Sequence, residues 1–127
     1  MVEIFRILVA VFLLMHGTFH IIWFLASWTT IPTGVRDGSW VLPGEVSIRS
    51  PLGKVWCLAA LVVLALFVVG AVALLLGEPW WANATNLGVF LSFGVVVPWW
   101  RQAPGSTAIY AIVSNIMLMF VLALELV

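Results

Sequence analysis

Charged side chains are scarce in this sequence, and their scarcity excludes an ordinary soluble fold. Asp, Glu, Lys and Arg make up 8% of the 127 residues, whereas a soluble domain carries roughly 25%. So few charges cannot cover a surface that faces water. The five basic and five acidic residues also balance. No basic patch is therefore left for a nucleic acid, and we expect no nucleic-acid partner.

Residues that carry common chemistry are also few. The single cysteine, Cys57, excludes an internal disulfide and any two-cysteine thiol–disulfide exchange. The sequence contains no glycine-rich phosphate loop and no paired carboxylates. These absences favour a protein that is not an enzyme.

Long apolar runs dominate what remains, since 65% of the residues are hydrophobic. Each of four runs approaches the roughly 20 residues that a helix needs to cross a bilayer. Most of the eight tryptophans lie near the ends of these runs, where an indole ring meets lipid headgroups. We predict membrane-spanning helices over about residues 4–28, 54–76, 79–100 and 107–127. The chain is thus predicted to be an all-α, integral membrane four-helix bundle in the lipid bilayer, with residues 1–127 as one domain.

Local signals mark several helix ends. Ser50 followed by Pro51 is typical of a helix N-terminus, and Gly77 is typical of a C-terminus. Pro79 can open the third helix. Pro98 removes a backbone donor, so we expect a kink in that helix and an unbonded carbonyl at Gly94.

The connections differ in length. Two are short hairpins, at 77–78 and 101–106, whereas the first loop runs from 29 to 53. Its Trp40, Val41 and Leu42 favour a loop that folds back as a cap over the bundle. Basic residues gather on the side of the first and third connections: Arg36, Arg49, Lys54 and Arg101. The positive-inside tendency then places this side in the cytoplasm and both termini outward, in a prokaryotic inner (cytoplasmic) membrane.

Four polar side chains lie at similar depth in these spans. His16 and His20 are four residues apart, so both rings lie on one helical face, about 6 Å apart along the axis. Ser92 in the third span and Asn115 in the fourth fall at matching depth. We expect these four side chains to share one layer. The second span has no comparable group, and we expect it to be the most lipid-exposed helix.

Several roles are open for the histidine pair. His16 and His20 could hold one transition metal, although no carboxylate lies at matching depth as a further ligand. A haem could pair His16 or His20 with Met117 or Met119 across helices. A quinone could accept a hydrogen bond from an imidazole. Alternatively, His16 ties the bundle together through Asn115 or Ser92 without any ligand, at about 0.6 kcal/mol for an average interhelical hydrogen bond.

The segment Met15-His16-Gly17-Thr18-Phe19-His20, followed by Trp23-Phe24, resembles an HG-x-x-H signature of small four-helix bacterial membrane proteins that grade into DoxX-like proteins. Further matches are Gly53-Lys54-Val55-Trp56, Gly77-Glu78-Pro79-Trp80-Trp81, Ser92 and Ser114-Asn115. These short motifs are spread over most of the chain. The resemblance implies a four-span bundle with His16 and His20 as family positions. It implies no specific reaction, and only an accessory role in a quinone-dependent redox assembly would follow from the DoxX-like relatives.

Three functions remain open at this point. The first is a non-catalytic accessory or structural subunit that associates laterally with a larger membrane complex or with itself. Small residues spaced by four, Gly88 with Ser92 and Ala111 with Asn115, would allow close helix contacts. The second is a cofactor-binding redox protein that uses the histidine pair with haem, a metal or quinone. The third, a small transporter or channel, is disfavoured because no acidic residue lies at membrane depth.

Overall fold

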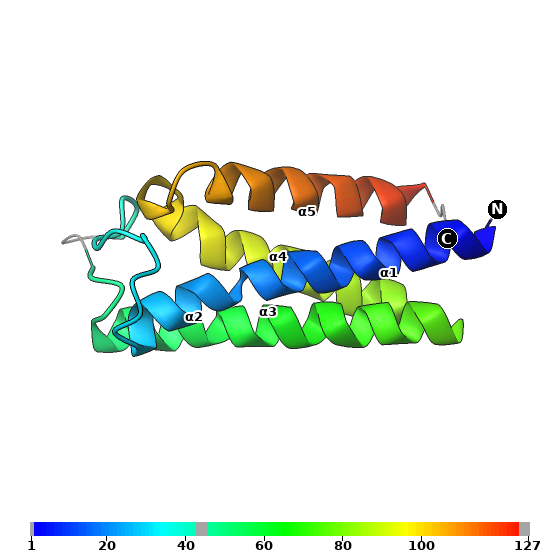
Figure 1. Ribbon diagram of the computed structural model, residues 1–127, viewed down its shortest axis with the longest axis horizontal. Coiled ribbons are helices and arrows are strands. Elements are labelled where there is room, and N and C mark those ends of the chain that lie inside the picture. The colour runs from blue at the N-terminus through cyan, green and yellow to red at the C-terminus, as the bar shows by residue number, and fades with distance from the viewer. Residues whose placement is uncertain (1, 43–45, 125–127) are drawn as a thin grey trace.

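The bundle is built from helices that run alongside one another (Figure 1). The computed structural model describes residues 2–42 and 46–124. Its elements are α1 (Val2–Phe19), α2 (Ile21–Trp28), α3 (Pro51–Leu76), α4 (Trp81–Val96), the 3₁₀ helix η1 (Val97–Gln102) and α5 (Thr107–Ala123). Within the described residues there is no strand. The prediction of an all-α helical bundle with one long first loop is therefore confirmed.

Three helical segments are long and apolar enough to cross a membrane. They are Glu3–Trp28 with 26 residues, Pro51–Leu76 with 26 and Trp81–Gln102 with 22. The fourth, α5, has 17 residues and so a length of about 25 Å. The end of the predicted fourth span, residues 125–127, lies outside the described residues.

Helix α3 has contacts with three other helices and is as buried as the other two long spans, so the expectation that it would be the most lipid-exposed helix is wrong. It packs against α1, α2 and α4, whereas α5 packs mainly against α4. Phe67, Val63 and Ala60 of α3 are completely buried. A helix that is apolar all round gives no sequence signal for which side faces its neighbours, and this is why its position was misjudged.

The ends of α3 follow the predicted signals. The Ser50 hydroxyl accepts a hydrogen bond from the Gly53 N–H at 3.1 Å, and Pro51 is the first helical residue. At the other end Gly77 adopts a left-handed conformation with φ of 76°, which stops the helix. Helix α4 begins at Trp81 and not at Pro79. Pro79 lies instead in the turn between the two helices.

Pro98 ends the regular part of the third span. From Val97 the chain continues as the 3₁₀ helix η1, with non-helical φ and ψ at Trp99. The Gly94 carbonyl, which loses its helical donor to the proline, accepts a hydrogen bond from the Trp56 indole at 2.9 Å. The predicted kink is therefore confirmed, and a tryptophan of α3 satisfies the carbonyl that the kink releases.

The first loop covers one end of the bundle, as Figure 1 shows at the left. The Asp37 carboxylate organises it by accepting hydrogen bonds from the Ser47 hydroxyl at 2.9 Å and from the Ile48 and Gly38 N–H groups at 2.8 and 3.0 Å. These bonds, that of Ser47 foremost, lower the pKa of the Asp37 carboxyl. Trp40 donates from its indole to the Val97 carbonyl at 2.6 Å. The described part of the loop is thus a cap, as predicted.

We predict that Gly53→Ala destabilises the protein by about 1–3 kcal/mol through overpacking. A Cβ at this position would overlap the backbone carbonyls of Ser47 and Ile48, which the cap holds against the start of α3. Unfolding by sodium dodecyl sulfate in mixed micelles, followed by circular dichroism, measures the difference. Gly94→Ala is the matched control, since nothing lies within 4 Å of a Cβ there. Equal stability of the two variants would contradict the packing of the cap.

Candidate functional site

Four polar side chains meet in the middle of the bundle. His16 comes from α1, His20 from the junction of α1 and α2, Ser92 from α4 and Asn115 from α5. His20 has an exposed fraction of 1%, and the other three have 0%. The structure therefore places these four predicted residues in one layer, shielded from the surroundings of the protein.

Hydrogen bonds join the four side chains into one chain, which we call the polar network. His16 Nε2 lies 2.8 Å from Asn115 Oδ1. Asn115 Nδ2 lies 2.8 Å from Ser92 Oγ, and Ser92 Oγ lies 2.6 Å from His20 Nε2. His20 Nδ1 then returns to α1, 3.1 Å from the His16 carbonyl oxygen. The network thus begins and ends at His16.

Burial of both rings favours neutral imidazoles, and for neutral rings the last contact determines the direction of each hydrogen bond in the network. A carbonyl oxygen only accepts, so His20 Nδ1 carries a hydrogen, and in a neutral imidazole its Nε2 is then an acceptor. The Ser92 hydroxyl donates to that Nε2 and accepts from the Asn115 amide N–H. Asn115 Oδ1 consequently accepts from His16 Nε2–H. Both histidines are neutral in this arrangement, and they are opposite tautomers.

The backbone at His20 forms a 3₁₀-type turn instead of continuing the α-helix, and this turn leaves a carbonyl free for the polar network. The His20 N–H bonds to the Gly17 carbonyl at 3.1 Å, three residues back, instead of to His16. The His16 carbonyl is thereby available to the His20 side chain. This tightened turn divides the first span into α1 and α2. The predicted span over 4–28 is present as Glu3–Trp28, and the apolar run carries no signal for the break at His20.

Aromatic rings surround the His16 imidazole. The centroid of Phe67 lies 5.0 Å from that of His16, and those of Phe12 and Tyr110 lie at 6.1 and 6.3 Å. Gly88 of α4 lets the Phe67 ring approach, because a Cβ there would lie 3.0 Å from it. Phe67 and Tyr110 cannot be recognised from the sequence as neighbours of His16, since rings in apolar runs carry no distinguishing signal.

One atom of the network lacks a hydrogen-bond partner. His16 Nδ1 is buried and bonds to no described residue. In the tautomer derived above, this nitrogen has a free lone pair and no hydrogen. It can therefore accept a hydrogen bond or bind a metal ion, but it cannot donate to a carbonyl oxygen.

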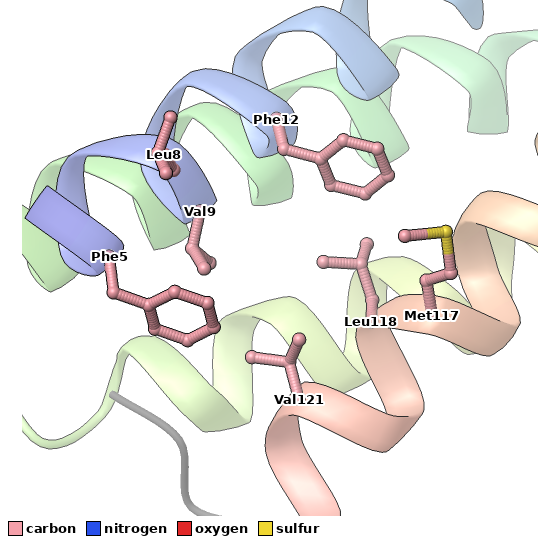
Figure 2. A pocket seen from close by; sticks show the side chains of 7 residues that line it. All are labelled: Phe5, Leu8, Val9, Phe12, Met117, Leu118 and Val121. Atoms are coloured by element: carbon pink, nitrogen blue, oxygen red, sulfur yellow. The ribbon is translucent and has the colours of Figure 1, made fainter.

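Met117 does not join the polar network. It is 53% exposed and lines an apolar groove between α1 and α5, where it lies with Leu118 and Val121 opposite Phe5 and Phe12 (Figure 2). Residues two apart on a helix point to different sides, so the burial of Asn115 turns Met117 outward. Met119 is also exposed, at 43%. Neither Met117 nor Met119 therefore lies in the buried layer that contains His16.

The structure places no third ligand beside His16 and His20 for the predicted metal site, among the residues that it describes. Among the described residues no group of three or more His, Cys, Asp and Glu side chains could hold a metal ion. His16 and His20 meet edge to face with centroids 5.0 Å apart. Their Nε2 atoms bond to different partners, Asn115 and Ser92, so the two rings do not converge on one point. Binding of a metal or cofactor by these histidines stays a prediction.

The small residues that are spaced by four on α4 and α5 pack inside the bundle. Gly88 and Ser92 of α4 are buried, as are Ala111 and Asn115 of α5. They allow α4 to approach Phe67 and α5 to reach the polar network. They consequently do not form an outward surface for a partner helix.

Comparisons of the chain with protein-family models, curated proteins and solved structures found no match. The site is therefore interpreted from its own geometry.

We predict that the two histidines show opposite tautomers by ¹⁵N nuclear magnetic resonance of histidine-labelled protein in detergent micelles at neutral pH. His16 should carry its hydrogen on Nε2 and His20 on Nδ1, as the carbonyl contact of His20 requires. His16→Gln and His20→Gln variants assign the two sets of signals. Two identical tautomers, or a charged imidazole, would contradict the derived arrangement.

We predict that Ser92→Ala lowers the free energy of unfolding by about 1–3 kcal/mol, because it leaves His20 Nε2 and an Asn115 N–H buried without partners. Adding His20→Phe should cost less than the sum of the two single changes, since the unpaired imidazole is then gone. Unfolding in mixed micelles measures the cycle. The control is Ser27→Ala, whose hydroxyl bonds within its own helix to the Phe24 carbonyl. Additive effects would show that Ser92 and His20 are not coupled.

Proposed function

We propose that this protein is a non-catalytic, integral membrane subunit that associates laterally with a larger membrane complex or with a second copy of itself. The observation that carries this proposal is that the buried polar groups of the network bond to one another. Four side chains and one carbonyl bond to one another, and only His16 Nδ1 has no partner among the described residues. An active site instead presents polar groups to a substrate. Apart from His16 Nδ1, these groups are engaged with one another, which favours a structural role in holding α1, α4 and α5 together.

The surface of the protein supports the lateral part of the proposal. Large apolar side chains cover the outer sides of the helices, including Ile7 and Val11 of α1 and Ile116 and Phe120 of α5. The loop cap and short turns are the chief described parts outside the apolar helices. Contacts within the bilayer are thus the main means of reaching a partner. With the small-residue faces buried, such contacts would use the larger outward side chains.

We propose a multi-pass location in a prokaryotic inner (cytoplasmic) membrane, with the loop cap in the cytoplasm and both termini outward. Four basic residues support this orientation, because they lie in the first loop, at the start of α3 or in η1, all at the cap end: Arg36, Arg49, Lys54 and Arg101. Arg6 lies toward the opposite end, in a pocket with Glu78. The difference follows the positive-inside tendency.

A second function is favoured by the free His16 Nδ1. A cofactor-binding redox protein could use this lone pair toward a metal ion or toward the hydroxyl group of a reduced quinone. An oxidised quinone offers only acceptor oxygens and would need the other tautomer. Tyr110 and Phe12 would flank such a ligand.

One preparation separates the two functions. We predict that protein extracted gently from its native membrane shows a dimer or a complex with another membrane protein by native mass spectrometry. Its absorbance spectrum should lack a Soret band, and metal analysis should find no stoichiometric metal. Extraction and chromatography of bound lipids test for quinone.

A lone monomer would overturn the subunit proposal. A stoichiometric cofactor that disappears in His16→Gln would establish the second function in its place. Retention of that cofactor in the His16→Gln variant would place it elsewhere in the protein.

A further inference from the structure

A pocket with two arginines lies where the loop cap meets the start of α5. It is lined by residues of the cap, η1 and α5: Arg36, Trp100, Arg101, Gly105, Ala108 and Ile109. No carboxylate lines it among the described residues. It is separate from the polar network and from the groove that Met117 lines. Its location at the end of the apolar helices corresponds to the depth of lipid headgroups.

Both guanidinium groups are held in place at this pocket. Arg36 donates from Nη2 to the Arg101 carbonyl at 3.1 Å, and its backbone N–H donates to the Gln102 carbonyl at 2.9 Å. The Arg101 guanidinium lies over the Trp40 ring, 4.9 Å from its centroid. Trp40 is itself fixed by its bond to the Val97 carbonyl. The two positive charges are therefore positioned by the fold and remain exposed at the pocket.

The nearest carboxylate in the sequence is already engaged. Asp37 follows Arg36 directly, but its oxygens accept hydrogen bonds from Ser47, Ile48 and Gly38. Its charge is stabilised within the cap. Arg36 in turn bonds toward η1 and lines the pocket with Arg101. An anion entering the pocket would meet two guanidinium groups, which suit phosphate oxygens.

The start of α5 adds a further attraction for an anion. Ala108, in the first turn of this helix, lines the pocket. The N-terminus of a helix carries a partial positive charge. The preceding Ser106 makes no side-chain hydrogen bond to the helix, so no hydroxyl caps its first turn. The arginines and the helix end thus favour the same kind of ligand.

The other side of the pocket is apolar and continues into the bilayer region. Ile109 is 59% exposed and Trp100 is 40% exposed. Farther along the same helix, Val113 and Ile116 are exposed as well. A free phosphate ion could use the arginines but not this surface. A phospholipid can use both, since its acyl chain would extend along α5.

We propose that this pocket is a binding site for an anionic phospholipid, whose phosphate contacts Arg36 and Arg101 and whose acyl chain lies along α5. Basic pockets between membrane helices bind anionic headgroups in this way. The lipid comes from the leaflet at the cap end. This inference does not depend on the proposed subunit function, because it concerns a surface outside both the polar network and the apolar groove.

Native mass spectrometry tests the site in full-length protein that is released from nanodiscs containing equal amounts of phosphatidylglycerol and phosphatidylcholine. We expect the wild-type protein to retain phosphatidylglycerol preferentially. Arg36→Gln and Arg101→Gln should each reduce this retention about fivefold, and the double variant about thirtyfold. Arg101→Lys keeps the charge and should retain most of the binding. Circular dichroism checks that each variant is folded.

The matched control is Lys54→Gln, which removes a positive charge at the same end of the protein. Lys54 lies over the Trp28 ring, 5.4 Å from its centroid, and does not line the pocket. We expect wild-type retention in this variant. An equal loss there, or equal retention of the two lipids by the wild-type protein, would overturn the proposal. Displacement of the lipid by excess inorganic phosphate would overturn it too, because the site would then recognise a free anion.

Discussion

The hydrogen bonds among His16, His20, Ser92 and Asn115 are the constraint on which the bundle depends. In hydrocarbon no water is present to satisfy an imidazole or an amide, so each such group must find its partner in the protein. Apolar side chains in lipid gain little by meeting one another. Apolar packing alone does not favour one orientation of each helix about its own axis. The polar network does, because its hydrogen bonds form only when these side chains face one another.

Backbone irregularities elsewhere in the bundle are satisfied in a similar way. Pro98 and the tightened turn at His20 each leave a carbonyl without its helical donor. A side chain then fills each gap: the Trp56 indole at Gly94 and the His20 imidazole at His16. Both irregularities consequently lie at positions where a nearby side chain offers an N–H group. They are part of how the helices are joined and need no appeal to flexibility.

The sequence allowed the fold and most of the polar layer to be predicted, for physical reasons that differ between the two. Run length and end signals such as Ser50 and Gly77 are local properties, and they located the helices. The scarcity of polar groups at membrane depth then made the meeting of His16 with Asn115 foreseeable. The central position of Phe67 could not be foreseen, because α3 is apolar on every side. Met117 lies outside the polar network, because helical geometry turns it away from the side of α5 that carries Asn115.

Asn115 lies 99 residues after the imidazole that it satisfies. At ribosomal speeds of about 5–20 residues per second, roughly 5–20 s separate the synthesis of these two partners. Throughout that interval the first span carries two imidazoles whose side-chain partners have not yet all been made. The nascent helix must therefore be sheltered by the insertion machinery or by water until its last partner arrives. The polar network can therefore close only after the last span has been synthesised.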